Sequence, residues 1–352
     1  MAANQTRPIR DPRPRKSEAE VQREKSQAEA ARFSHAVDCL RKSKVISKFR
    51  TNVSDVEHEA QFERTLRILK PYYDQSVYPE HAYSHFYGPW VENLWILMVT
   101  KMNASEFKPL IPLPIQWTDM GVFYSRKQNK ANAANAAKIF EKVLQEIIAP
   151  QYVYVSVVQG DCRPTAEITK RWPNIIFISS GGYGHVAIPL IMEGELQPPC
   201  PKDIPISFYG KTKTSKLRAQ MLKSFAVSGL KVATTCLDYQ WSVRRTVVGL
   251  APRGYGRTSY RLYEYLLSGA IPLYVYDDLP WIPYPALNWS SFAIVASIKK
   301  MQQSVRRVRA LLDPHNSAAR AQLREMQAAL NVTAPQYFTQ KAIVAHIRRF
   351  LL

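Results

Sequence analysis

Short apolar runs alternate with amphipathic stretches along most of the chain. Runs of strand type, rich in β-branched and aromatic residues, occur at 110–117, 152–158, 175–178, 206–209, 246–251 and 270–276. Between them, apolar residues recur at helical spacing, as in 132–148, 215–225 and 259–267. Strands that lack polar alternation and are separated by helices are typical of a parallel sheet covered by helices on both faces. The pattern predicts an α/β fold.

A proline-rich passage at 197–205 (QPPCPKDIP) interrupts this alternation and predicts a domain boundary. We expect a first Rossmann-like domain over 31–200 and a second over 201–335. Residues 336–352 are expected to form a final helix. Residues 1–30 are charged and basic without an apolar face, which predicts a disordered tail.

The most informative stretch is 246–278, which reads as strand, glycine-punctuated loop, helix and strand. Gly254 allows backbone angles and close approaches that a Cβ would forbid. Thr258 or Ser259 is placed to cap the helix, and Gly269 lies where a helix C-terminal glycine belongs. A strand that feeds a glycine loop and a helix N-terminus forms an anion site, because free N–H groups and the helix dipole point at one place.

Three arginines crowd this predicted site: Arg253, Arg257 and Arg261. The planar guanidinium fork suits phosphate oxygens better than a lysine does. Glu264 follows Arg261 by three positions and lies one turn deeper in the helix. Phosphates at the helix start and a sugar hydroxyl at the carboxylate would suit a nucleotide-sugar. The alternative is a solvated basic face on which Glu264 only pairs with Arg261.

Residues 252–294 (PRGYGRTSYRLYEYLLSGAIPLYVYDDLPWIPYPALNWSSFAI) resemble the C-terminal signature of the exostosin-like glycosyltransferases. Weaker likeness continues upstream in YGPWVEN, IPLPIQWTD, YVSVVQGD and ISFYGKTKTSKLRAQM. The resemblance implies the GT-B arrangement, in which two Rossmann-like domains face each other across a cleft and a C-terminal helix crosses back to the first domain. It also implies an inverting transferase that needs no metal or other cofactor.

The resemblance implies that the donor is a nucleoside-diphosphate sugar, expected to be a UDP-sugar, and that the acceptor is a hydroxyl of a glycan or glycoprotein. The donor would be held by Arg253, Gly254, Arg257, Thr258, Ser259, Arg261 and Glu264, with Glu264 on the nucleotide ribose.

Inverting transfer also needs a base that takes the proton of the attacking hydroxyl. The base should come from the first domain at the end of a strand, where open α/β sheets bind their ligands. Asp119, Asp161 and His185 all follow predicted strands and are the candidates. The family has no fixed position for this base, so the resemblance does not choose among them.

The net charge of the chain is also compatible with a second class of function. The chain carries 48 Lys and Arg against 28 Asp and Glu, a net charge of +20. Such a balance is also typical of proteins that bind polyanions, so the alternative function is a catalytically inactive basic module that binds polyanions or glycans. The sequence has no zinc-finger, RNA-strand or basic-zipper signature, so we do not expect nucleic acid as a partner.

A metal site and a membrane span receive little support. Asp277 and Asp278 are adjacent, and neighbouring residues on a strand point to opposite faces, so they would chelate one ion poorly. No run reaches the roughly 18 apolar residues that a transmembrane helix needs. Animal and plant members of the family usually carry an N-terminal anchor, and this chain departs from that pattern. We expect a soluble chain, cytoplasmic or from a Golgi lumen, for which peripheral membrane contact stays open.

Overall fold

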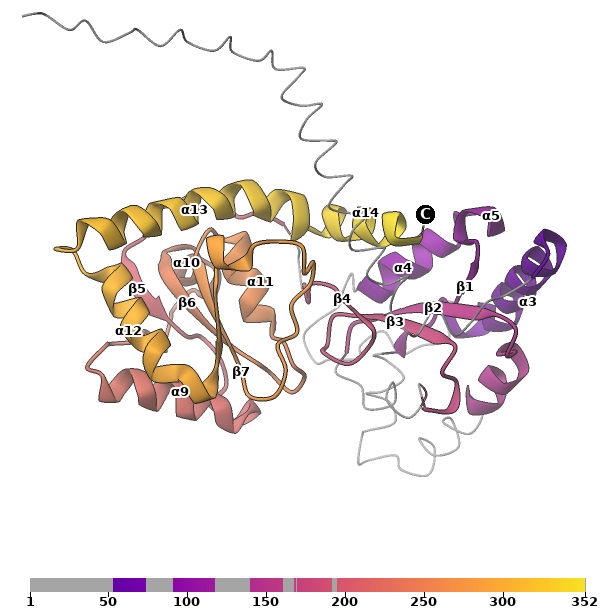
Figure 1. The fold of residues 1–352 in the computed structure, drawn as a ribbon, viewed down its shortest axis with the longest axis horizontal. Coiled ribbons are helices and arrows are strands. Elements are labelled where there is room, and N and C mark those ends of the chain that lie inside the picture. The colour runs from indigo at the N-terminus through magenta and orange to yellow at the C-terminus, as the bar shows by residue number, and fades with distance from the viewer. Residues whose placement is uncertain are drawn as a thin grey trace, which may run out of the picture.

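The computed structural model describes residues 53–73, 91–117, 140–160, 168, 170–191 and 195–351. Within them the chain forms two four-stranded sheets, ordered β1-β2-β3-β4 and β5-β6-β7-β8, and every neighbouring pair is parallel. Helices pack on both sheets (Figure 1). The prediction of an α/β fold with parallel sheets is confirmed. The predicted tail at 1–30 lies outside the described residues.

The first sheet is almost wholly buried. Tyr154, Val155 and their strand neighbours pair with residues 175–179 on one side and 110–112 on the other. Every residue of β2 and β3 is buried, which explains their continuous apolar sequence. The strands are β1 (Leu110–Pro112), β2 (Val153–Val158), β3 (Ile175–Ser179) and β4 (Val186–Ala187). The helices include α3 (Asp55–Tyr73), α4 (Val91–Val99) and α5 (Ala104–Phe107), and residues 140–147 are also helical.

The second sheet carries the glycine loop and its helix. Its strands are β5 (Ile204–Ser207), β6 (Thr246–Pro252), β7 (Ile271–Tyr276) and β8 (Ile294–Ser297). Its helices are α9 (Lys216–Val227), α10 (Tyr239–Arg244), α11 (Tyr260–Leu267) and α12 (Met301–Leu312), with short 3₁₀ turns η2 (Thr212–Thr214), η3 (Trp289–Ser291) and η4 (Ile298–Lys300). In Figure 1, α9 and α12 lie on one face of this sheet, and α10, α11 and α13 lie on the other.

Two strands differ from the sequence prediction. The strand expected at 110–117 ends at Pro112, and the last bond to β2 is donated by the N–H of Leu113 to the carbonyl of Val155 at 2.8 Å. The strand expected at 206–209 runs over 204–207 instead. Beyond it, the N–H of Phe208 bonds to the carbonyl of Ala233 at 2.8 Å rather than to β6. The apolar pattern located both strands but not their ends.

Helices α13 (Ser317–Tyr337) and α14 (Gln340–Leu351) complete the fold. Helix α13 packs on α11 and β7 of the second sheet, whereas α14 packs on α4 of the first (Figure 1). Arg348 of α14 also pairs with Glu106 at 2.9 Å. The C-terminal helices therefore join the two halves of the chain. In the part of the chain that the structure describes, none of the helices has the length and apolar character to cross a bilayer.

Candidate anion and nucleotide site

A reversal of strand order brings two loops together at the carboxyl edge of the second sheet. Ser207 of β5 pairs with Gly249 of β6 and, on its other side, forms a parallel bridge with Ala233. The chain therefore leaves β5 through α9 in one direction and returns through α10 to β6 in the other. Ligands of open α/β sheets bind at such a reversal. The loops that leave it are 208–215 and 253–259.

Each of these loops ends at a helix N-terminus. Ser215 is the N-cap of α9 and Ser259 is the N-cap of α11, and neither side chain makes a capping hydrogen bond. Ser259 is 5% exposed, and its Oγ has no hydrogen-bond partner among the described residues. A buried hydroxyl without a partner at the positive end of a helix is well placed to bind an anion.

The loop before α11 is a closed turn. The N–H of Gly254 donates to the carbonyl of Thr258 at 2.7 Å, and Thr258 is 2% exposed. A Cβ on Gly254 would lie 3.3 Å from that carbonyl and 3.6 Å from Nη2 of Arg218. The glycine therefore leaves room for backbone and arginine to approach each other closely.

Two of the predicted phosphate arginines are paired with carboxylates. Nη1 of Arg253 lies 2.8 Å from Asp277 and 3.8 Å from Asp278, and Nε of Arg257 lies 2.9 Å from Asp278. Both guanidinium groups are mostly covered, with 17% and 23% of the side chain exposed. Asp277 and Asp278 thus act together on the arginine loop. An anion that binds Arg253 or Arg257 has to compete with these carboxylates.

The third arginine forms a network with Glu264. Nη1 of Arg261 and the hydroxyl of Tyr239 both donate to Oε2 of Glu264, and Nε of Arg261 donates to the carbonyl of Tyr209. The Arg261 guanidinium also lies over the Tyr239 ring, 4.5 Å from its centroid. Burial, followed by the charge of Glu264, raises the pKa of Tyr239 well above its ordinary value. Tyr239 therefore stays protonated and holds the carboxylate as a donor.

A fourth arginine, which the sequence analysis missed, lies between the two loops. Arg218 is 7% exposed; its Nε donates to the carbonyl of Arg253 at 3.1 Å and its Nη1 to that of Lys211 at 2.9 Å. It has no carboxylate partner among the described residues. Burial, followed by the charge of Arg261, lowers its pKa to about 10. The sequence did hold a signal for Arg218: the pair Gly210–Lys211 precedes a helix, and Arg218 lies in the first turn of that helix.

The position of Arg218 is electrostatically costly. It lies in the first turn of α9 together with Lys216 and with no acidic residue, so its charge meets the positive end of the helix dipole. A buried charge without a counter-ion is also disfavoured by desolvation. A bound anion would relieve both costs.

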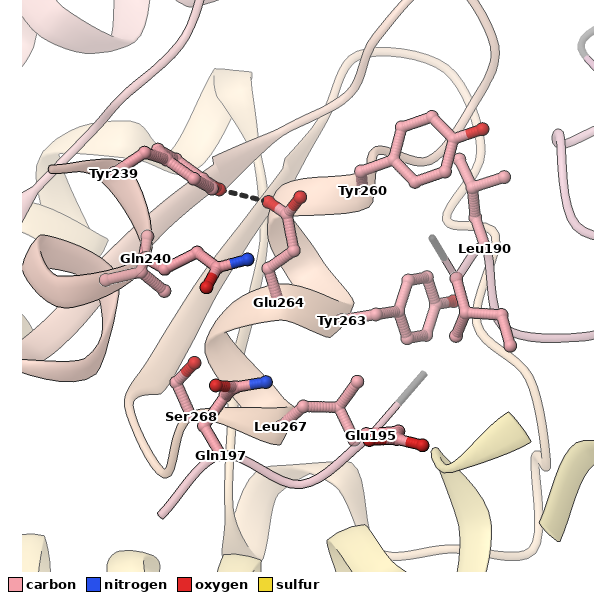
Figure 2. A pocket seen from close by; sticks show the side chains of 12 residues that line it. Leu190, Glu195, Gln197, Tyr239, Gln240, Tyr260, Tyr263, Glu264, Leu267 and Ser268 are labelled. Atoms are coloured by element: carbon pink, nitrogen blue, oxygen red, sulfur yellow. Dashed lines mark hydrogen bonds between the residues drawn. The ribbon is translucent and has the colours of Figure 1, made fainter. Parts of the chain in front are cut away.

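A pocket of about 130 Å³ runs along α11 beside this network (Figure 2). It begins at Tyr260, the residue after Ser259, and Figure 2 shows the Glu264 side chain at one wall, directed toward Tyr239. This volume suits one ring rather than a whole nucleotide-sugar. The wall consists of Leu190, Ile191, Glu195, Gln197, Tyr239, Gln240, Val243, Tyr260, Tyr263, Glu264, Leu267 and Ser268.

The first half of the chain contacts this site directly. The N–H of Arg257 donates to the carbonyl of Gly181 at 3.2 Å, and its guanidinium lies 4.9 Å from the ring centroid of Tyr183. Nε1 of Trp281 donates to the carbonyl of Ser179, the last residue of β3, at 3.0 Å. The loop after β3 and the loop after β6 are therefore in contact.

Of the three candidate bases, only His185 lies in the described part of the chain. Its Nδ1 accepts the N–H of Phe177 at 2.9 Å, and burial lowers its pKa. The neutral ring then carries its proton on Nε2 and has no free lone pair for a substrate proton. Asp119 and Asp161 lie outside the described residues. This geometry argues against His185 as a base.

Within the described residues, no group of three or more His, Cys, Asp or Glu side chains is arranged to hold a metal ion. Comparison with protein-family models and with curated proteins finds no match for this chain.

Proposed function

We propose that the protein is an inverting glycosyltransferase of exostosin type that uses a nucleoside-diphosphate sugar, with UDP as the expected nucleotide. The observation that carries the proposal is Arg218, an arginine that is 7% exposed and has no carboxylate partner among the described residues, at the strand-order reversal. The unpartnered Oγ of Ser259 supports it, because both groups call for an anion at the same edge of the sheet. The resemblance of residues 252–294 to the exostosin-like family indicates which anion this would be, the diphosphate of a nucleotide-sugar.

In this proposal the diphosphate lies between the N-termini of α9 and α11. Arg218 and Ser259 donate to its oxygens, and Gly254 leaves room for them. Arg253 and Arg257 also bind the diphosphate, by exchanging their carboxylate partners, Asp277 and Asp278, for phosphate oxygens. Charge-assisted hydrogen bonds from arginine are stronger than neutral ones and can be bidentate. They would stabilise the diphosphate most when it leaves with its full charge.

In the same proposal, Glu264 binds the nucleoside. Its carboxylate lies at the wall of the pocket and is oriented by Tyr239 and Arg261. A carboxylate held in this way can accept hydrogen bonds from ribose hydroxyls. The ring-sized pocket beside it would hold one ring of the nucleoside.

The reaction is a single displacement. The acceptor hydroxyl oxygen attacks the anomeric carbon, the bond from that carbon to the diphosphate oxygen breaks, and its electron pair leaves with the diphosphate. The hydroxyl proton passes to the base, Asp119 or Asp161. No oxidant, reductant or further cofactor is needed to balance this step.

Thermal-shift binding tests the proposal. The protein is titrated with UDP, UMP, uridine, other nucleoside diphosphates and a set of nucleotide-sugars, with and without manganese. Stabilisation by a diphosphate nucleotide that is lost in Glu264→Gln and Ser259→Ala, and kept in the exposed-surface variant Arg320→Met, is the expected result. If no nucleotide raises the melting temperature while heparin does, the transferase proposal fails and the basic polyanion-binding module replaces it.

A further inference from the structure

The outer surface of the α9–α12 helix layer is strongly basic. The segments 204–237 and 279–312 contain eleven Lys and Arg residues and no Asp or Glu. These two segments supply α9 and α12, which pack against each other in the structure. Charges that are far apart in the sequence are therefore brought onto one side of the second sheet.

Six exposed side chains define this surface, which we call the basic face: Lys216, Lys223, Lys299, Lys300, Arg306 and Arg309. Lys216 and Lys223 are seven residues apart and share one stripe of α9. On α12, Arg306 lies opposite the buried Val308, and Arg309 lies on the flank of the helix that faces the end of α9. None of the six has a carboxylate partner in the described part of the chain, so their charge is not compensated locally.

The two helices that carry most of the basic face are in contact. Arg309 donates to the carbonyl of Ser228 at the end of α9, which ties the two helices together. Both helices cover the same side of the sheet, away from α14 (Figure 1), and α12 also contacts α13.

We infer that the basic face binds the surface of an anionic lipid bilayer. Four of its six cations are lysines, which act as point charges and suit a diffuse anionic surface better than a specific bidentate contact. Neither α9 nor α12 exposes an aromatic side chain that could stack on a nucleic-acid base. Val227, at the end of the α9 stripe, is 75% exposed and offers the bilayer an apolar contact.

This surface is independent of the proposed transferase activity, although it adjoins the candidate site. Helix α9 starts from the loop 208–215, whose Lys211 and Lys213 are exposed. Binding through the basic face would hold that loop close to the lipid headgroups.

Co-sedimentation with vesicles tests the inference. The full chain is mixed with vesicles of phosphatidylcholine alone, or with about one-third phosphatidylserine, at physiological ionic strength. We expect binding to the anionic vesicles only. The triple variant Lys216→Glu, Lys223→Glu, Arg306→Glu should weaken binding roughly a hundredfold, since each cation at the surface contributes roughly fivefold. The matched control Arg320→Glu, Arg324→Glu, Lys341→Glu changes the net charge equally at exposed positions of α13 and α14 and should bind nearly as well as the parent.

Three results would overturn the inference. One is failure of the parent to bind anionic vesicles, with or without binding to heparin or duplex RNA. Another is equal weakening in both triple variants, which would assign binding to net charge instead of this face. The third is unchanged binding in the basic-face variant. If that variant does not fold by circular dichroism, the glutamine version of the same three positions replaces it.

Discussion

Arg218 and Arg253 are joined by a 3.1 Å hydrogen bond from the side chain of one to the carbonyl of the other, although they belong to different loops. The bond connects the start of α9 to the loop before α11. One buried guanidinium therefore sets the distance between the two helix N-termini of the candidate site.

Arg218→Met should weaken binding of UDP by about ten- to a hundredfold, since a hydrogen bond to a charged group contributes roughly 1.5–3 kcal/mol. Uridine, which has no phosphate, should be affected much less. Arg218→Lys keeps the charge but not the two-carbonyl bridge and should recover only part of the affinity. Isothermal titration calorimetry of UDP, UMP and uridine checks this, with Arg320→Met as control. Equal losses for all three ligands would indicate a structural role alone.

Gly182→Ala should loosen the contact between the two halves of the chain. Gly182 has φ +110, and an added Cβ would lie 2.5 Å from the backbone nitrogen of Arg257. We expect faster hydrogen exchange at 253–259. The close contact should also lower the free energy of unfolding by about 1–3 kcal/mol. Gly229→Ala is the matched control, because Gly229 has φ +76 but nothing within 4 Å of its added Cβ. The Gly229→Ala variant should show backbone strain but no change in hydrogen exchange at 253–259. Similar hydrogen exchange at 253–259 in both variants would argue against the contact.

Gly249→Ala should destabilise the second sheet. An added Cβ would lie 2.2 Å from Cγ of Tyr265, whose ring is fully buried between β6 and α11. Overpacking of this kind costs about 1–3 kcal/mol and more where backbone has to move. Urea unfolding measures the loss. The double variant Gly249→Ala, Tyr265→Leu should be less destabilised than the two single changes added together, and strict additivity would show that the ring is not the obstacle.

The pairing of Asp278 with the arginine loop should make stability depend on acid pH. Partial burial raises the pKa of Asp278, but the hydrogen bond from Arg257, a backbone donor and the arginine charges outweigh it, so the net shift is downward. A carboxylate with a lowered folded-state pKa stabilises the protein above its unfolded pKa of about 3.9, and this contribution disappears as the pH falls through the folded-state value. Asp278→Asn should therefore be less stable than the parent at neutral pH.

Urea unfolding from pH 7 down to pH 3 follows this difference, which should shrink with acidification. A cycle with Arg257→Gln assigns it to the ion pair. A constant difference at all pH values would contradict the assignment.

Local features of the sequence predicted much of the second sheet. The apolar runs at 246–251 and 270–276 correspond to β6 (Thr246–Pro252) and β7 (Ile271–Tyr276). The helix between them has Ser259 at its N-cap position and ends shortly before Gly269, which has φ +69°. These features depend on neighbouring residues, such as an apolar period, a cap and a glycine. The strand at 206–209 was misplaced by two residues, because its end depends on Ala233, a distant partner in the sequence.

By itself, the sequence determined the alternation of strands and helices, the glycine loop before α11 and the presence of several arginines near it, because each is a property of a short segment. Only the tertiary structure decided which arginines are paired. It placed Asp277 and Asp278 against Arg253 and Arg257, Glu264 and Tyr239 against Arg261, and left Arg218 with backbone carbonyls as its partners. The sequence determines the charge of a side chain. Its counter-ion and its burial depend on which distant segments the folded sheet brings together.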